Sequence, residues 1–361
     1  MKRVHLFTII AVLLLYGKTS EACTGISMTA GDKSYIQART IEWGGSNLES
    51  QYVIVPRNMT QTSYTPTGVN GLTFKSKYGY VGLAVVQKEF VAEGINEAGL
   101  SAGLFYFPNY GSYKDYDSKY NSTTIADLQL VSWMLSQFAT VDEVVNSINN
   151  VRVVSIQNDE NSSSSAIHWR VGDPSGKQIV IEIVDGVTNI YNNTVGVLTN
   201  SPGFPWQLTN LNNYVNLHAG SAAPNLIDGM KLSPTGAGSG LLGLPGDYTP
   251  PSRFVRVAFF KATAPVLNTA LETVNQCFNI LNNFDIPIGT EFTKNEITDL
   301  PSATQWTSVI DLTHKEVYFK TMYNNTIRKI SLDDIDFAKV KYQSHPLDKE
   351  KVQPIVDIKI R

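Results

Sequence analysis

The chain has 361 residues, of which 42% are hydrophobic and 17% are charged, and its formal net charge is −3 at pH 7. This length and composition predict a globular protein with one large core or two small domains. Because the chain is mildly acidic and has no run of basic residues, nucleic acid is not expected as a partner. Stable association with an anionic membrane is excluded on the same ground.

The N-terminal 22 residues carry the three parts of a secretory signal. Two basic residues near the start precede the apolar run Leu6–Tyr16, and small residues stand at Ser20 and Ala22, just before Cys23. The apolar run is shorter than the roughly 20 residues that cross a bilayer. We therefore predict that residues 1–22 are removed as a signal peptide, leaving an exported protein in the periplasm or outside the cell.

A lipoprotein signal is the nearest alternative, because it also ends at a cysteine. Such a signal would carry an aliphatic residue at position −3 and a small residue at −2, where this chain has Ser20 and Glu21. The pattern favours a free N-terminus at Cys23. We expect residues 23–361 to form a single domain.

Strand patterns dominate the first third of that domain, helical patterns follow, and strands return near the end. Gly31 and Asp32 predict a hairpin between the first two strands. The order predicts an α+β fold in which two antiparallel sheets pack on each other with helices outside. The predicted strands are Thr24–Thr29, Tyr35–Ile41, Tyr52–Val55, Val81–Val86, Ala166–Val171, Gln178–Val184, Gly196–Thr199, Trp306–Leu312 and Glu316–Met322, and the helical regions are 124–138, 141–148 and 253–283.

Cleavage before Cys23 would place a thiol and a free α-amino group on one residue. An ordinary amine pKa near ~7.7–8.0 leaves the amine partly neutral at working pH, so it can take the thiol proton. The hairpin could bring Arg39 beside the terminus, where its charge would favour the thiolate, and Glu42 could hydrogen-bond the ammonium or the thiol. The alternative is that Arg39 and Glu42 are surface charges on a half-buried strand.

Cys277 is the second cysteine of the chain. In an exported protein the two cysteines could form a disulfide. Leu271, Val274, Phe278 and Leu281 predict a helix with Cys277 on its apolar face, which favours a buried, inert thiol.

Four blocks of residues follow one another from Cys23 onward. They are Cys23–Gly25 with Ala38–Trp43, Gly94–Leu100 with Phe105–Pro108, Val197–Pro202 with Trp206–Gln207 and Leu211–Tyr214, and Gly243–Asp247 with Ser252–Arg256. Over residues 23–340 the chain resembles the choloylglycine hydrolase family, which contains bile salt hydrolases and penicillin V acylases. The resemblance implies the four-layer αββα sandwich of the N-terminal nucleophile hydrolases.

The resemblance also implies the residues of the catalytic site. The Tyr106 backbone N–H and the Asn200 side-chain amide would bind the oxyanion, and Arg39 and Arg253 would lower the pKa of the Cys23 thiol. Two positions vary in the family. The position of Glu42 is usually Asp, and the position of Tyr106 is typically Tyr in penicillin V acylases and Asn in bile salt hydrolases. The implied catalytic residues are Cys23, Arg39, Glu42, Tyr106, Asn200 and Arg253.

The activity that the resemblance implies is hydrolysis of a linear, non-peptide amide in a small N-acyl substrate, without a cofactor. Penicillin V and conjugated bile salts fit this description, and N-acyl homoserine lactones are an alternative. Tyr106 favours an aromatic or aliphatic acyl group over a steroid. A non-catalytic, lipid-anchored binding protein of the same fold is the other alternative, because a fold can outlive its chemistry. A homotetramer is a further expectation, since relatives are commonly tetramers.

Other motifs predict no additional chemistry. Gly238–Gly243 matches G-x-G-x-x-G but does not follow a predicted strand, so we expect no dinucleotide site. No pair among the histidines has the spacing of metal ligands, so we expect no metal. Trp43 and Trp206 could line a substrate pocket with Tyr106, and core packing accounts equally well for both tryptophans.

Overall fold

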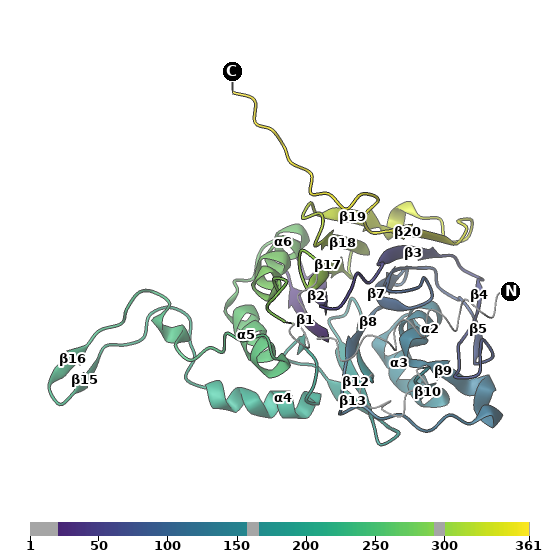
Figure 1. The fold of residues 1–361 in the computed structure, drawn as a ribbon, viewed down its shortest axis with the longest axis horizontal. Coiled ribbons are helices and arrows are strands. Elements are labelled where there is room, and N and C mark those ends of the chain that lie inside the picture. The colour runs from purple at the N-terminus through teal and green to yellow at the C-terminus, as the bar shows by residue number, and fades with distance from the viewer. Residues whose placement is uncertain (1–20, 157–165, 292–299, 361) are drawn as a thin grey trace.

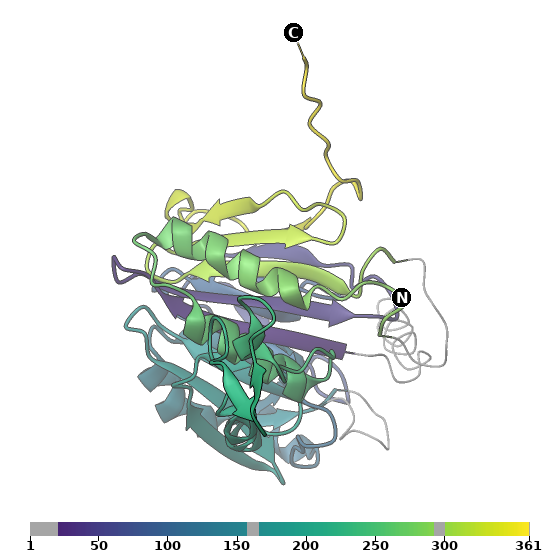
Figure 2. The same ribbon diagram turned by 90° about the vertical axis from the view of Figure 1, so that its left-hand side faces the viewer.

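The computed structural model describes residues 21–156, 166–291 and 300–360, so most of the predicted leader lies outside it. Two antiparallel sheets lie face to face. Helices α5 (Pro250–Thr263) and α6 (Ala270–Leu281) pack on one sheet, and α2 (Leu130–Gln137) packs on the other, as Figures 1 and 2 show. This arrangement confirms the predicted α+β fold with four layers, αββα.

The six-stranded sheet carries the N-terminal segment between other strands. The first two strands, β1 and β2, pair along their whole length through the turn at Gly31 and Asp32, as predicted. The sheet order is β14 (Val197–Leu198), β1 (Glu21–Thr29), β2 (Tyr35–Trp43), β17 (Thr304–Asp311), β18 (Glu316–Thr321) and β19 (Arg328–Ser331).

The eight-stranded sheet contains four strands that the sequence did not predict, β7, β8, β13 and β20. Strands β7 and β8 each have an internal glycine, and glycine weakens a strand pattern. A Cβ at Gly103 would lie 2.0 Å from Glu93 Oε2, so this glycine makes room for a buried carboxylate. The sheet order is β13 (Val187–Asn192), β12 (Gln178–Val184), β11 (Ile167–Gly172), β8 (Ser101–Tyr106), β7 (Val91–Asn96), β6 (Tyr80–Ala84), β3 (Gln51–Val55) and β20 (Gln343–Pro346).

Two predicted helices have different bounds in the structure. The helix expected over 124–138 begins only at α2, because Thr124–Ala126 forms strand β9, parallel to β10 (Arg152–Val154). The region 253–283 is two helices, since Pro265 cannot continue α5 and Thr269 caps α6. The remaining helices are α3 (Val141–Ser147), near its predicted place, and α4 (Phe204–Asn210).

Helix α6 holds the second cysteine in the core. Cys277 is fully buried, and both cysteines are free thiols, so the disulfide alternative is wrong. Burial raises the pKa of Cys277 to about 12, as expected for an inert thiol. No helix within the described ranges is long and apolar enough to cross a membrane.

A two-stranded arm projects from the body of the molecule. Strands β15 (Asn225–Ile227) and β16 (Met230–Leu232) form it, and Figure 1 shows it extending away from α4 and α5. Leu226 is 68% exposed and Met230 is 62% exposed. The third small strand pair is β4 (Thr60–Thr62) with β5 (Thr73–Lys75).

Candidate active site

Cys23 lies on the face of β1 that it shares with Arg39. In the β1–β2 register, Cys23 is opposite Ile41 and Gly25 is opposite Arg39, and residues directly opposite in an antiparallel pair point to the same face. Arg39 Nη2 donates a hydrogen bond to Cys23 Sγ at 2.8 Å, and both side chains are buried. The hairpin therefore brings the arginine to the thiol.

Arg39 is fixed by backbone oxygens, a ring and a carboxylate. Its Nε donates to Thr40 O at 3.1 Å and its Nη1 donates to Ala92 O at 3.2 Å. The guanidinium lies 4.2 Å from the centre of the Phe105 ring, and Glu93 Oε2 lies 3.6 Å from Nη1. A buried charge held on several sides cannot easily move away from the thiol.

Glu93 also pairs with a second buried arginine, Arg170, which the sequence reasoning missed. Arg170 Nη2 donates to Glu93 Oε1 at 3.0 Å, and its Nη1 donates to the backbone oxygens of Ile26 and Ala38, each at 3.0 Å. This pair joins β1 and β2 to the other sheet. The signal in the sequence is one charged residue inside each of two otherwise apolar strands.

Asn200, two residues beyond β14, connects the Cys23 backbone to β8. Its Oδ1 accepts the Cys23 N–H at 2.8 Å, and its Nδ2 donates to Tyr106 O at 2.7 Å. An amide nitrogen carries two protons, so Asn200 can donate one more hydrogen bond. A backbone hydrogen bond from Tyr106 to the thiol lowers the pKa of Cys23. The Tyr106 backbone at the thiol and the Asn200 side chain at the Cys23 backbone are thus two groups of the kind that stabilise an oxyanion.

Arg253, on α5, binds the backbone of Cys23 and the side chain of Thr24 from the opposite face of β1. Its Nη1 donates to Cys23 O at 2.5 Å and to Thr24 Oγ1 at 2.8 Å, and its Nη2 donates to Asn200 Oδ1 at 2.7 Å. Arg256 instead donates to backbone oxygens of the segment before α5. Arg253 is therefore the arginine of α5 that reaches the site.

Glu42 lies on the face of β2 opposite to that of Arg39. It pairs with Ala22 in the register, and its Oε1 accepts a hydrogen bond from Thr304 Oγ1 at 3.4 Å. Its Oε2 has no hydrogen-bond partner within the described residues. Burial raises the pKa of Glu42 to about 8, although Arg253 acts in the opposite direction. Glu42 is therefore opposite the residue that precedes Cys23 in the β1–β2 register.

The thiol of Cys23 has competing influences on its pKa. Burial is the largest and raises the pKa, and the Glu42 carboxylate adds to it. Arg39 and Arg253 lower it, as the sequence predicted, but the net shift in this chain is upward. The cations therefore offset part of the burial penalty without outweighing it.

The two tryptophans and the glycine motif of the sequence analysis lie in three different parts of the fold. Trp206 lies on α4 and is 48% exposed, so core packing does not account for it. Trp43 is partly buried at the end of β2. Gly238–Gly243 lies in the loop between the arm and α5, and its Ser239–Leu241 part is a short 3-10 helix. The glycine motif is thus not at the start of a helix that follows a strand.

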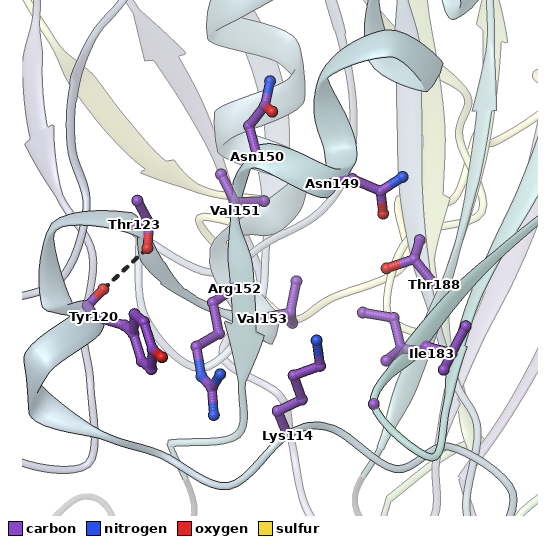
Figure 3. Close-up of a pocket in the computed structure, with 12 residues that line it drawn as sticks. Lys114, Tyr120, Thr123, Asn149, Asn150, Val151, Arg152, Val153, Ile183 and Thr188 are labelled. Carbon is purple, nitrogen blue, oxygen red and sulfur yellow. Dashed lines mark hydrogen bonds between the residues drawn. The ribbon is translucent and has the colours of Figure 1, made fainter.

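A groove of about 470 Å³ lies between the β12–β13 turn and residues 149–153 (Figure 3). Lys114 and Arg152 project into it from facing segments, and the Arg152 guanidinium lies 5.0 Å from the centre of the Tyr120 ring. None of the six candidate residues lines this groove. It is separate from the centre around Cys23.

Comparison with known proteins agrees with this geometry. The family model described as linear amide C–N hydrolases, choloylglycine hydrolase family, matches residues 23–347. A bile salt hydrolase/transferase from Clostridium perfringens is 33% identical over 88% of this chain and 95% of the relative. A penicillin V acylase from Pectobacterium atrosepticum is 26% identical over 91% of this chain and 86% of the relative.

Solved structures show the same architecture. A mutant of conjugated bile acid hydrolase from Clostridium perfringens superposes with a TM-score of 0.81 at 30% identity, covering 93% of this chain and all of that one. Penicillin V acylase from Agrobacterium tumefaciens, at 24% identity, has the same fold, with a TM-score of 0.73 over 90% of this chain and 92% of the other. The chain therefore belongs to the choloylglycine hydrolase family and is a hydrolase of non-peptide C–N bonds in linear amides.

Proposed function

We propose that this hydrolase is exported, is cleaved before Cys23, and uses the Cys23 thiolate as its nucleophile. The observation that carries the proposal is the 2.8 Å contact between Arg39 Nη2 and Cys23 Sγ. The Tyr106 backbone is hydrogen-bonded to the same thiol, and Asn200 Oδ1 accepts the Cys23 N–H. The family match beginning at residue 23 supports cleavage at this point.

In the proposed reaction the thiolate attacks the acyl carbon of the amide. Negative charge that develops on the carbonyl oxygen is bound by the Tyr106 N–H and the remaining Asn200 amide proton. The Cys23 α-ammonium, formed when the amine takes the thiol proton, then protonates the leaving amine. Water cleaves the thioester with the amine again acting as base. Arg253 holds Cys23 O and Asn200 Oδ1 together throughout.

We also infer that the leader is removed before β1 finishes pairing. Ala22 is 1% exposed and Cys23 is 4% exposed, and residues 21 and 22 continue the β1–β2 ladder opposite Trp43 and Glu42. A protease needs an accessible, locally unfolded segment, which this buried bond does not offer in the folded chain. Cleavage during export, on an unfolded chain, satisfies this requirement.

The substrate class is an N-acyl amide, and two kinds are favoured by different observations. Tyr106, as in penicillin V acylases, favours an aromatic or aliphatic acyl group. The higher identity to the bile salt hydrolase/transferase, 33% against 26%, favours a conjugated bile salt. We place penicillin V first, because Tyr106 lies directly beside the thiol.

The arm supports assembly into a homotetramer. An isolated two-stranded hairpin is marginal in water, and Leu226, Ile227 and Met230 are each more than half exposed on it. Exposed apolar side chains gathered on a projecting element are typical of a protein interface. A second copy of the chain is the partner we propose.

Three measurements test the function. Mass spectrometry of the secreted protein should show a free amine at Cys23. A start at another residue would contradict the mechanism, and an acylated Cys23 would support a lipid-anchored protein. Amidase activity should disappear in Cys23→Ala. The purified wild-type protein should be assayed on penicillin V, glycocholate and an N-acyl homoserine lactone. A tenfold preference for glycocholate would reverse the substrate order.

A further inference from the structure

His168 connects the two segments that carry the oxyanion donors. It is the second residue of β11, is completely buried, and lies opposite Phe105 in the register with β8. Its Nε2 lies 3.0 Å from Thr199 O, and its Nδ1 lies 3.1 Å from Glu182 Oε1. Both ring nitrogens therefore face oxygen atoms.

The hydrogen-bonding chemistry requires one proton to be shared by His168 and Glu182. Because Thr199 O can only accept, His168 Nε2 must carry a proton. Nδ1 then donates to an ionised Glu182, or a protonated Glu182 donates to Nδ1. In either form the buried pair has no net charge and keeps both contacts. Breaking one contact would leave a buried polar group unpaired, which is unfavourable, so the ring is held in place.

The pair holds the Asn200 segment at two points. Thr199, whose carbonyl receives the His168 hydrogen bond, directly precedes Asn200. Glu182 Oε1 also accepts the Phe204 N–H at 2.8 Å. The backbone is thus anchored immediately before Asn200 and again shortly after it.

The same imidazole packs against the segment of Tyr106. The ring of Phe107, the next residue, stacks on His168 with ring centres 4.4 Å apart and planes 5° from parallel. Phe105, the preceding residue, meets the imidazole edge-on at 6.2 Å. One buried side chain therefore contacts both neighbours of Tyr106 and the neighbour of Asn200.

We propose that His168, backed by Glu182, is a positioning residue that sets the spacing between the Tyr106 N–H and the Asn200 amide. This inference rests on the proposed function, because it assigns a role within that oxyanion hole. His168 touches neither Cys23 nor Arg39 in any contact of the described residues, so its effect should be confined to steps that form an oxyanion.

The test compares His168→Phe and Glu182→Ala with the matched control Glu182→Gln. Glu182 makes both contacts through Oε1, so glutamine can keep one of them, either by donating to Nδ1 of a neutral His168 or by accepting the Phe204 N–H. Glu182→Gln should therefore lose less kcat than Glu182→Ala. His168→Phe and Glu182→Ala should each lower kcat by about 10–100-fold and leave KM nearly unchanged. This loss is smaller than the one caused by removing an oxyanion donor, because the donors would be displaced and not removed.

Alkylation of Cys23 by iodoacetamide distinguishes positioning from general damage, because this reaction forms no oxyanion. Its rate should stay within about twofold in every variant if the thiol is untouched. Phe107→Leu, which keeps an apolar side chain and loses the stacking, is a second probe and should lower kcat by about threefold or more. Thermal unfolding checks that each variant is folded.

A double-mutant cycle completes the experiment. His168→Phe should add little to the loss already produced by Asn200→Ala, since the spacing that His168 sets matters only while both donors are present. If the wild type is active and Cys23→Ala is not, but His168→Phe and Phe107→Leu keep wild-type kcat, the positioning role is overturned and the proposed function stands. Equal losses in hydrolysis and alkylation also overturn it. A wild type with no amidase activity overturns both proposals.

Discussion

Replacing Arg39 with glutamine tests how the buried thiol becomes a thiolate. Burial raises the pKa of Cys23, and Arg39 is the strongest influence in the opposite direction. Arg39 Nη2 lies 2.8 Å from Cys23 Sγ in a fully buried site. At an effective dielectric constant of about 20, unit charges at this separation attract by about 6 kcal/mol.

Glutamine keeps a hydrogen-bond donor, and Arg253 remains, so we expect about half of this attraction to be lost and the thiol pKa to rise. The assay is the pH dependence of Cys23 alkylation by iodoacetamide, read by mass spectrometry on protein that begins at Cys23. At pH values below the titration midpoints of both proteins, Arg39→Gln should be alkylated about 100-fold more slowly than the wild type. Cys277 should not interfere, because burial raises its pKa to about 12.

Two arginine variants serve as controls. Arg39→Lys keeps the charge but not the several hydrogen bonds, so its midpoint should lie between those of the wild type and Arg39→Gln. Arg256→Gln removes a buried arginine from α5 that does not contact the thiol, and its midpoint should not change. An unchanged midpoint in folded Arg39→Gln would refute the assigned role of Arg39.

Three further predictions concern other parts of the molecule. Asn200→Ala should lower kcat by about 10²–10³; a loss below tenfold in steady-state kinetics would show that Asn200 is not an oxyanion donor. Burial raises the pKa of Asp127 to about 7, so its stabilising contribution is complete below about pH 4 and is lost as the pH rises to 7; Asp127→Asn should remove this loss of up to about 4 kcal/mol. Urea unfolding of both proteins at pH 5 and pH 8 measures it, and equal pH dependence would contradict it. Replacing Leu226 and Ile227 with aspartate should reduce the mass seen by light scattering if the arm joins copies, and an unchanged mass would argue against this.

The hairpin and the block spacing made much of the site predictable from the sequence. Gly31 and Asp32 fix a tight turn, so the strand register follows and Arg39 reaches the thiol. Asn200 and Arg253 come from distant segments, and only the family resemblance pointed to them. Their contacts with Cys23 arise from how α5 and β14 pack on β1, which periodicity does not encode.

The supporting charges could not be predicted, because burial reverses the usual reading of a charged residue. Glu93 and Arg170 look like surface residues in isolation. In the structure both are buried, and Arg170 Nη2 donates to Glu93 Oε1 across the intervening strand β8. Only the pairing of β8 between β7 and β11 brings their strands into one sheet. The same is true of His168 and Glu182, which lie on adjacent strands β11 and β12.

The register of β1 determines which face of the strand carries Cys23. A slip of one residue would move Cys23 to the face that carries Thr24 and Arg253, away from Arg39. A chain that begins at Cys23 has no preceding residues to hold the register, so the strand beyond the nucleophile must do so. Residues Gly25 and Ile26 pair with β2 on one side and with β14 on the other. Arg170 also binds Ile26 O from the opposite sheet. The buried pair of Glu93 and Arg170 therefore holds β1 in place, and Glu93 also contacts Arg39 beside the Cys23 thiol. Loss of this pair should disorder the start of β1 before the domain unfolds.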